Sequence, residues 1–196
     1  MLKKLFNPDK KYEQYRWFFT SGGILVVGGK SEEQNELAIK NFMKPNYTLI
    51  HTLKPGSPFM IIQSDNPSKK DLEETAIFCA CFSKQWKLNK KLIEVDVFKG
   101  EQLYKTKSMK LGTFGVKGEK KTMKAKPELV LIIQKGKLRA VPKTIKEKKL
   151  AEIKPGNLSK EQAAEKLAKK IKDKFHFPVS KEEVMQAIPS DKIEIK

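Results

Sequence analysis

Apolar residues occur along the chain in short runs separated by turn residues, which is the pattern of paired β-strands. Three pairs of runs rich in β-branched and aromatic residues flank glycine-containing loops: residues 16–20 with 24–27, 47–53 with 59–63, and 128–134 with 137–141. One further run, residues 93–98, has no such neighbour. The pattern therefore predicts three antiparallel hairpins and one additional strand.

Helical spacing appears between these runs. Residues 31–43 begin with Ser31, carry Gln34 at the capping-box position and end before Pro45. Residues 68–86 predict a second, amphipathic helix. Its apolar positions recur at steps of three and four: Leu72, Ala76, Cys79, Phe82 and Trp86.

The C-terminal region predicts a linker followed by two helices. Residues 143–157 are polar and interrupted by proline and glycine, which favours a linker. Helices begin after Ser159 and Ser180, each with a capping partner three residues later. The first helix carries six lysines on one side. Its opposite face is apolar and consists of Ala164, Leu167, Ala168, Ile171 and Phe175. We expect a domain at residues 1–142. Residues 143–196 then form this linker and a helical extension that packs on the domain.

Strand pairs interleaved with helices, without regular β-α-β alternation, favour an α+β fold over a doubly wound parallel sheet. We expect a mixed, largely antiparallel sheet built from hairpins and packed with helices. A chain of 196 residues is long enough to bury a sizeable core without disulfides or metals.

The charge of the chain indicates which class of partner it binds. The chain carries 41 basic and 23 acidic residues, a net charge of +18, and all but Arg16 and Arg139 of the basic residues are lysines. Such a balance favours polyanions. Lysine suits phosphate, whereas bidentate reading of base edges favours arginine, so contact with an RNA backbone is expected ahead of sequence readout.

The positive charge is concentrated in two stretches. Residues 99–126 carry a balance of +7 and residues 135–174 a balance of +9, whereas residues 31–83 are slightly acidic. In the first stretch the lysines are interleaved with Tyr104, Phe114 and four glycines. Cationic loops with an aromatic residue suit phosphate binding and base stacking. The alternative is a solvated lysine surface, which applies most to the helix after Ser159.

Enzyme, metal and membrane signals are weak. Gly29-Lys30-Ser31 imitates the end of a phosphate-binding loop but lacks the glycine five residues earlier, so we interpret it as a strand-to-helix turn. Two histidines and two cysteines do not supply a zinc site at normal spacing, and no cofactor is expected. Cys79 and Cys81 predict buried free thiols on different sides of a helix, typical of a reducing cytoplasm. The longest uncharged stretch, residues 17–29, is too short to span a membrane.

His51 is the only histidine in an apolar run. It is compatible with a satisfied core histidine, with a ring at the sheet surface that meets RNA, or with the base of an RNA-modifying or RNA-cleaving enzyme. No paired serine or cysteine nucleophile accompanies it, so we predict no enzyme.

Several motifs in the same order resemble the NFACT-R domain family over nearly the whole chain. The matching segments are residues 11–23, 25–30, 34–36, 50–51 with 56–59, 72–74 with 82–86, 112–114 with 117–118, and 183–189, the last resembling archaeal members. The chain departs from the family pattern at Gly22, where an acidic residue is usual, and at Thr52-Leu53, where an Ala-Asp pair is usual.

The resemblance implies an RNA-binding α+β module related to the C-terminal part of ribosome quality control proteins. It implies tRNA or large-subunit rRNA and the ribosome as partners. Because 196 residues leave no room for the domains that precede this module in the large family proteins, we expect a standalone form. A separate protein would then supply those domains.

Together these observations predict a cytoplasmic RNA-binding protein in ribosome-associated quality control or translation. The expected RNA-binding residues are Arg16, His51, Ser83, Lys84, Lys87, Lys105, Lys107, Lys110, Phe114, Lys117, Lys120 and Lys121. The first alternative is an accessory factor or enzyme in tRNA modification. The second is an adaptor whose positive face docks on an acidic protein or membrane, with the last amphipathic helix as its contact.

Overall fold

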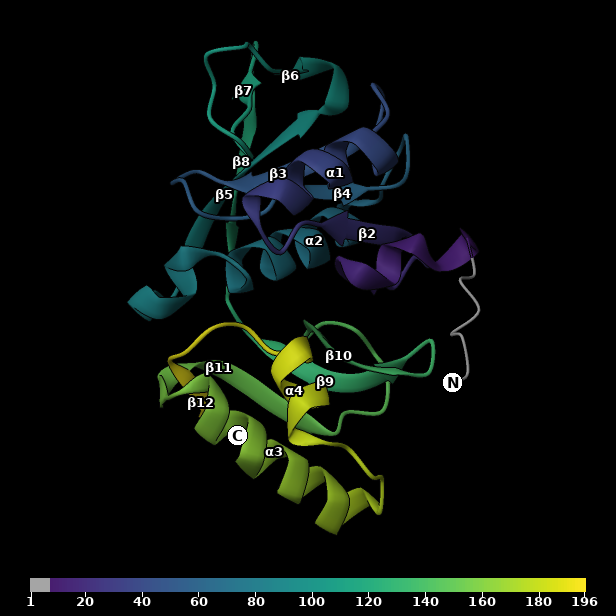
Figure 1. Ribbon diagram of the computed structural model, residues 1–196, viewed down its shortest axis with the longest axis vertical. Helices are drawn as coiled ribbons and strands as arrows, with labels where there is room; N and C mark the ends of the chain where they lie inside the picture. Colours follow the sequence, from purple (N-terminus) through teal and green to yellow (C-terminus); the bar gives the residue numbers. More distant parts are fainter. Residues whose placement is uncertain (1–7) are drawn as a thin grey trace.

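The computed structural model describes residues 8–196 and has an α+β fold, as predicted. In chain order its elements are η1 (Pro8–Gln14), β1 (Arg16–Phe19), β2 (Leu25–Gly28), α1 (Glu32–Phe42), β3 (Thr48–Thr52), β4 (Met60–Ile62), α2 (Lys69–Cys81), η2 (Lys84–Leu88), β5 (Ile93–Lys99), η3 (Gly100–Gln102), β6 (Leu103–Tyr104), β7 (Gly115–Val116), β8 (Lys121–Ala125), β9 (Leu129–Gln134), β10 (Lys137–Pro142), β11 (Ala151–Leu158), α3 (Lys160–Phe175), α4 (Lys181–Ala187) and β12 (Ile193–Ile195). Figure 1 shows two layered halves, one ending with β8 and the other beginning with β9.

The first half is built on a six-stranded antiparallel sheet in the order β1-β2-β4-β3-β5-β8. The two hairpins predicted in the first 63 residues are confirmed as β1 with β2 and β3 with β4. In the register of β3 with β5, His51 lies opposite Asp96. These two polar residues are therefore neighbours on one face of the sheet, and His51 lines the candidate site described below.

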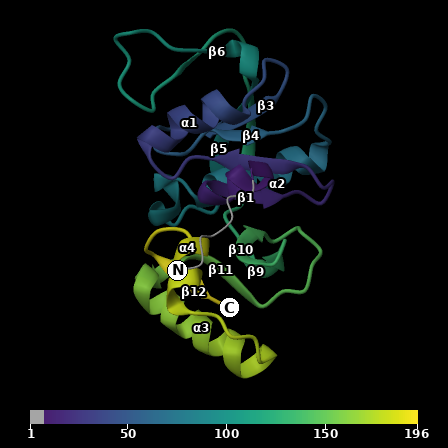
Figure 2. The same cartoon turned by 45° about the vertical axis from the view of Figure 1, so that its right-hand side comes forward.

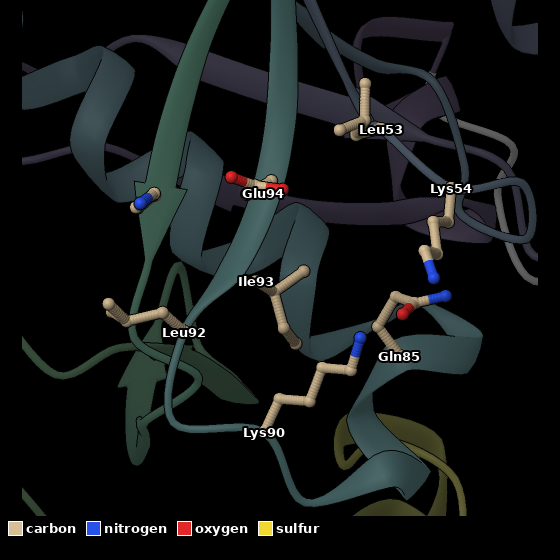
Figure 3. Close-up of a pocket in the computed structure, with 8 residues that line it drawn as sticks. Leu53, Lys54, Gln85, Lys90, Leu92, Ile93 and Glu94 are labelled. Atoms are coloured by element: carbon tan, nitrogen blue, oxygen red, sulfur yellow. The ribbon is translucent and has the colours of Figure 1, made fainter.

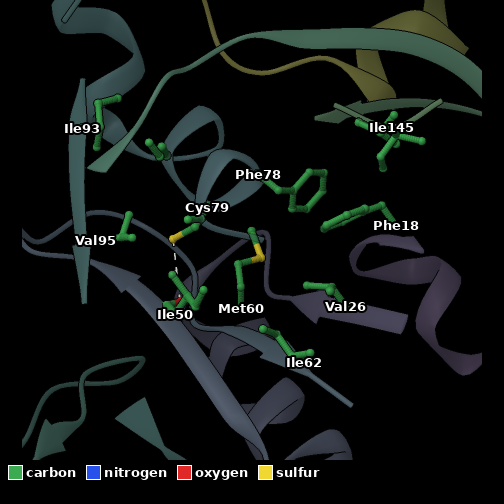
Figure 4. Packing of buried hydrophobic residues seen from close by; sticks show 14 of the residues in the cluster. Phe18, Val26, Ile50, Met60, Ile62, Phe78, Cys79, Ile93, Val95 and Ile145 are labelled. Carbon is green, nitrogen blue, oxygen red and sulfur yellow. Dashed lines mark hydrogen bonds between the residues drawn. The ribbon is translucent and has the colours of Figure 1, made fainter. Parts of the chain in front are cut away.

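Helices cover both faces of this sheet. The side chains of α1 pack with Leu49, Ile61 and Phe98 on one face. On the other face α2 packs with Ile50, Val95 and their neighbours, and Figure 4 shows Cys79 and Phe78 pointing into this cluster. Both cysteines are free and buried, and they belong to different clusters, as their two-residue spacing predicts. Because α2 also packs against the second half, it is buried on more than the single face that its periodicity predicts.

The second half is a four-stranded antiparallel sheet in the order β10-β9-β11-β12, covered by α3 and α4. The predicted hairpin of β9 and β10 is confirmed, and Lys135 and Gly136 both adopt positive φ in its turn. Both C-terminal capping boxes are also present, at Ser159 and Ser180. The apolar face predicted for α3 is confirmed, since Ala164, Leu167 and Ile171 are buried there.

The linker predicted at 143–157 is wrong in its second half, because β11 occupies residues 151–158. Alternating residues of β11 are buried, and the strand pairs with β9 over residues 151–153 and with β12 beyond. Pro155, which argued for a linker, lies past the segment that pairs with β9, where its missing N–H breaks no bond of that ladder. The chain passes from the first sheet to the second near residue 126. The division into domains at residue 142 stays a prediction.

The predicted helix 68–86 is wrong in its C-terminal end. α2 stops at Cys81, and Ser83 starts the separate helix η2 by accepting the Gln85 N–H at 3.1 Å. A serine in this position competes with helix continuation because its hydroxyl satisfies a free backbone donor. Strand β8, in the lysine-rich stretch, and strand β12 were also not predicted.

Candidate nucleic-acid interface

A cleft of about 470 Å³ lies where β1, β3, the start of α1 and two loops meet. It is the place where the fold gathers sequence-predicted residues that are far apart in the chain. Four of them line it: Arg16, His51, Lys84 and Phe114. The cleft combines aromatic rings and cations, the two kinds of group that bases and phosphates contact.

The imidazole of His51 is held on the wall of the cleft. It stacks on Phe59 with ring centroids 4.5 Å apart, and its Nδ1 lies 2.7 Å from the carbonyl oxygen of Thr52. Burial lowers the pKa of His51 more strongly than its contacts with backbone carbonyls raise it. The ring is therefore neutral at pH 7, with Nδ1–H as donor, and it is half-buried instead of belonging to the closed core.

Phe114 enters the cleft from the loop between β6 and β7. Its ring meets Phe59 edge to face at 5.5 Å, and Lys105 Nζ lies 4.8 Å from its centroid. The loop is fastened to α1, because Glu36 pairs with Lys105 and accepts the N–H of Gly112 at 2.9 Å. Gly112 has φ +73°, and a Cβ there would lie 2.8 Å from Glu32 Cα, so only glycine permits this approach.

Two of the sequence-predicted cations, Arg16 and Lys84, also line the cleft. The guanidinium of Arg16 lies 4.5 Å from the Phe82 ring, and burial lowers its pKa to about 10, so it stays charged at pH 7. The N–H of Lys84 donates to Gly56 O at 2.8 Å, and the Lys84 stem covers that glycine closely enough to leave no room for a Cβ. These contacts hold both residues in the lining of the cleft.

Two predicted residues lie away from both the cleft and the lysines beyond it. Ser83 is buried, and its hydroxyl donates to Ala80 O at 2.7 Å while it accepts from Gln85, which leaves it a role in positioning Lys84. Lys87 lies on η2 and faces the second half of the molecule, where its Nζ is 3.6 Å from Asp191.

The remaining predicted lysines form a rim on the strands and loops beyond the cleft. Lys107, Lys110 and Lys121 are exposed, and Lys117 Nζ lies 5.2 Å from the Tyr104 ring centroid. Lys120 is engaged in an ion pair of 2.5 Å with Asp96, the residue opposite His51. Lys105 and Lys120 are thus already paired with carboxylates, whereas the other rim lysines are available to a polyanion.

The sequence reasoning missed Lys30, which also lines the cleft. It lies in the Gly29-Lys30-Ser31 segment, which is the strand-to-helix turn we interpreted it to be, between β2 and α1. The signal that could have indicated Lys30 is the pairing of β1 with β2. Arg16 lies opposite Gly28, and Lys30 follows Gly28 by two residues, which brings it near Arg16.

A second, smaller hollow of about 200 Å³ has a different character. Figure 3 shows five of the residues that line this hollow: Leu53, Gln85, Lys90, Leu92 and Ile93. Leu53 and Leu92 are both about half exposed. None of the sequence-predicted residues lines this hollow, and it brings no aromatic ring together with its lysines.

The part of the chain that the structure describes holds neither a metal-ligand cluster nor a membrane-spanning helix. Within residues 8–196 no three histidine, cysteine or acidic side chains are grouped as metal ligands would be. Over the same range no helix has both the length and the apolar character needed to cross a bilayer.

Comparison with known proteins decides the family. Residues 14–118, more than half of the chain, match the family described as the NFACT protein RNA binding domain. The chain belongs to this NFACT RNA-binding family. Arg16, His51, Lys84 and Phe114 all fall within the matched residues, so the cleft is part of the family module.

Relatives of this NFACT RNA-binding chain carry names from ribosome quality control. The archaeal Rqc2 homolog aRqcH of Methanocaldococcus jannaschii is 29% identical over the whole chain, which spans 31% of that protein. Ribosome quality control complex subunit NEMF of Homo sapiens is 28% identical over 38% of this chain, a match that covers 7% of the human protein. The chain thus spans less than a third of these relatives.

A solved structure supports the fold. The C-terminal part of the fibronectin/fibrinogen-binding protein from Streptococcus suis superimposes with a TM-score of 0.54 at 21% identity. The match covers 65% of this chain and 51% of that one. At this identity the likeness concerns the arrangement of strands and helices.

Proposed function

We propose that this protein binds RNA of the translation machinery, tRNA or ribosomal RNA, through the cleft and the lysine rim beside it. The observation that carries the proposal is the convergence of Arg16, His51, Lys84 and Phe114 from four separated segments into one open cleft. Membership of a family described as RNA-binding supports it. So does the net charge of +18.

The groups divide into two roles. The rings of His51 and Phe114 offer surfaces for an unpaired base, and a neutral histidine also offers hydrogen bonds without requiring a charged partner. Arg16, Lys84 and the free rim lysines contact phosphates. Ser83 and Lys105 act as positioning residues, the first for Lys84 and the second for the loop that carries Phe114.

The relatives suggest the setting. Because they are named as ribosome quality control proteins, we place this protein in that process or in translation more generally, in the cytoplasm. Lysine-dominated contacts favour a partner recognised by its shape and backbone, as structured RNA is. The RNA bound is then selected by an exposed base at the cleft more than by an extended sequence.

Salt-dependent binding tests the proposal. Labelled tRNA and ribosomal subunits are titrated with the protein at several salt concentrations, and the logarithm of the association constant is plotted against that of the salt. We expect a decline of about 0.7 to 0.9 per phosphate neutralised. Lys110→Gln with Lys117→Gln and Lys121→Gln reduces both affinity and slope.

A matched variant controls for net charge. Lys166, Lys169 and Lys172 are exposed on α3, away from the cleft, and their replacement by glutamine removes the same three charges. We expect this variant to retain at least most of the affinity. An equal loss in both variants shows non-specific attraction and contradicts the site, and absence of binding at low salt contradicts the function.

A further inference from the structure

Four cations meet where the two halves of the molecule join. Arg16 comes from β1, Lys30 from the turn before α1, Arg139 from β10 and Lys160 from the first turn of α3. We call these four residues the junction cluster. It contains both arginines of the chain, and two of its members lie beyond the residues that match the NFACT family.

The fold fixes this convergence. Arg16 lies opposite Gly28 in the β1–β2 ladder, so Lys30 follows two residues later and lines the same cleft. Arg139 reaches across the junction, and its Nε and Nη2 donate to the Trp17 carbonyl at 3.2 and 2.7 Å. Figure 2 shows β1 and α2 facing β10 and α4 across this junction.

The charge of Arg16 acts on the other three members of the cluster. Burial lowers the pKa of Arg16 and of Arg139 to about 10, and the charge of Arg16 contributes to the lowering at Arg139. Burial also lowers the pKa of Lys30 and of Lys160, with Arg16 adding to the effect in both cases. These directions agree with the geometry, in which Arg16 and Lys30 line one cleft and Arg139 contacts Trp17 beside Arg16 in a partly desolvated place.

Carboxylates near the junction do not neutralise this cluster. Glu13 faces Arg139 but also pairs with Lys137 at 3.3 Å, and Asp191 faces Lys160 but also pairs with Lys87 at 3.6 Å. Among residues 11–196 no carboxylate forms an ion pair with the guanidinium of Arg16, which lies over the Phe82 ring at 4.5 Å. Gathering four cations around two shared carboxylates costs free energy that a bound anion would recover.

The groups have the chemistry of a phosphate site. A guanidinium offers five N–H donors in a planar fork that matches phosphate oxygens, and Arg139 uses only two of its donors on Trp17. Lys30 is exposed at the mouth of the site, so an anion can enter. Arg16 belongs to both the junction cluster and the cleft, which makes the two surfaces continuous.

We propose that the junction cluster binds a phosphate group, and that this group is a backbone phosphate of the RNA strand that occupies the cleft. The second part rests on the proposed function. The phosphate joins side chains from both halves of the molecule and thereby fastens the C-terminal sheet to the NFACT RNA-binding part. The C-terminal sheet then contributes directly to RNA binding.

The first arm of the test uses inorganic phosphate alone. Melting temperatures are measured in phosphate and in chloride at equal ionic strength, for the wild type, for Lys30→Gln with Lys160→Gln, and for Lys166→Gln with Lys169→Gln. A ligand that binds only the folded state raises the melting temperature. Phosphate stabilises folded proteins in general, so we expect a larger rise in the wild type and in the control pair than in the junction pair. An equal rise in all three, or no rise in the wild type, overturns the phosphate site.

The second arm uses labelled tRNA with the same three proteins. We expect the slope of log affinity against log salt to fall by about 0.7 in the junction pair, one phosphate contact, and to stay unchanged in the control pair. An unchanged slope in the junction pair, with the phosphate effect present, assigns the site to free phosphate and overturns its RNA role. If the wild type binds no RNA while phosphate still stabilises it, the proposed function fails and the phosphate site stands.

Discussion

The side-chain amide of Gln134 pairs with both backbone polar groups of Phe19, accepting its N–H at 2.7 Å and donating to its carbonyl at 2.9 Å. β1 is an edge strand, and this amide replaces the missing neighbour. Arg139 does the same for the carbonyl of Trp17. The second half of the molecule thus closes the open edge of the first sheet, which explains how β1 and β10 come to lie together.

Replacing Gln134 by leucine should destabilise the protein by about 1–3 kcal/mol. The substitution leaves the N–H and carbonyl of Phe19 without these partners while Gln134 itself is buried. Urea unfolding followed by circular dichroism measures the change. Gln186→Leu, at an exposed position of α4, is the matched control and should change stability by less than about 0.5 kcal/mol. Equal effects would contradict the edge-closing role.

Phe114→Leu should weaken RNA binding by about 1–3 kcal/mol with little change in melting temperature. Leucine keeps apolar contact with Phe59 but removes the aromatic face on which a base can stack. Fluorescence anisotropy with labelled tRNA measures the affinity. Wild-type affinity in this variant would show that Phe114 serves only packing.

Acidification should cost the wild type more stability than His51→Gln. The pKa of His51 lies below its ordinary value of 6.5 in the folded state because of burial. The unfolded chain therefore takes up this proton first, and stability falls as pH decreases from about 7 towards the folded pKa. Urea denaturation of both proteins between pH 5 and 8 gives the difference. Parallel curves would contradict a buried neutral imidazole.

The attachment of the Phe114 loop should loosen at acid pH. Lys105 and the N–H of Gly112 bind the Glu36 carboxylate and hold its pKa below the ordinary 4.5, against a smaller opposing effect of burial. The attachment is therefore complete above pH 4.5 and is lost as pH falls through the lowered folded pKa. The amide NMR signal of Gly112 should follow this titration. In Glu36→Gln the same signal should no longer titrate there, and persistence of the titration would assign it to another group.

The sequence by itself determined the elements that have strong local signals. Turn residues between β-rich runs predicted three hairpins, and serines with capping partners predicted the starts of α3 and α4, because such signals act over a few residues. Charge and family motifs also selected Arg16, His51, Lys84 and Phe114, which line one cleft.

Only the tertiary structure decided the features that depend on residues far apart in the chain. The pairing of β11 with β9 and β12 overrides the proline and glycine that suggested a linker, because burial of alternate side chains outweighs local backbone preference. The meeting of Arg16 with Arg139 joins positions more than 120 residues apart, through the closure of an edge strand. Electrostatic coupling follows distance in space, and the order of residues along the chain does not contain that distance.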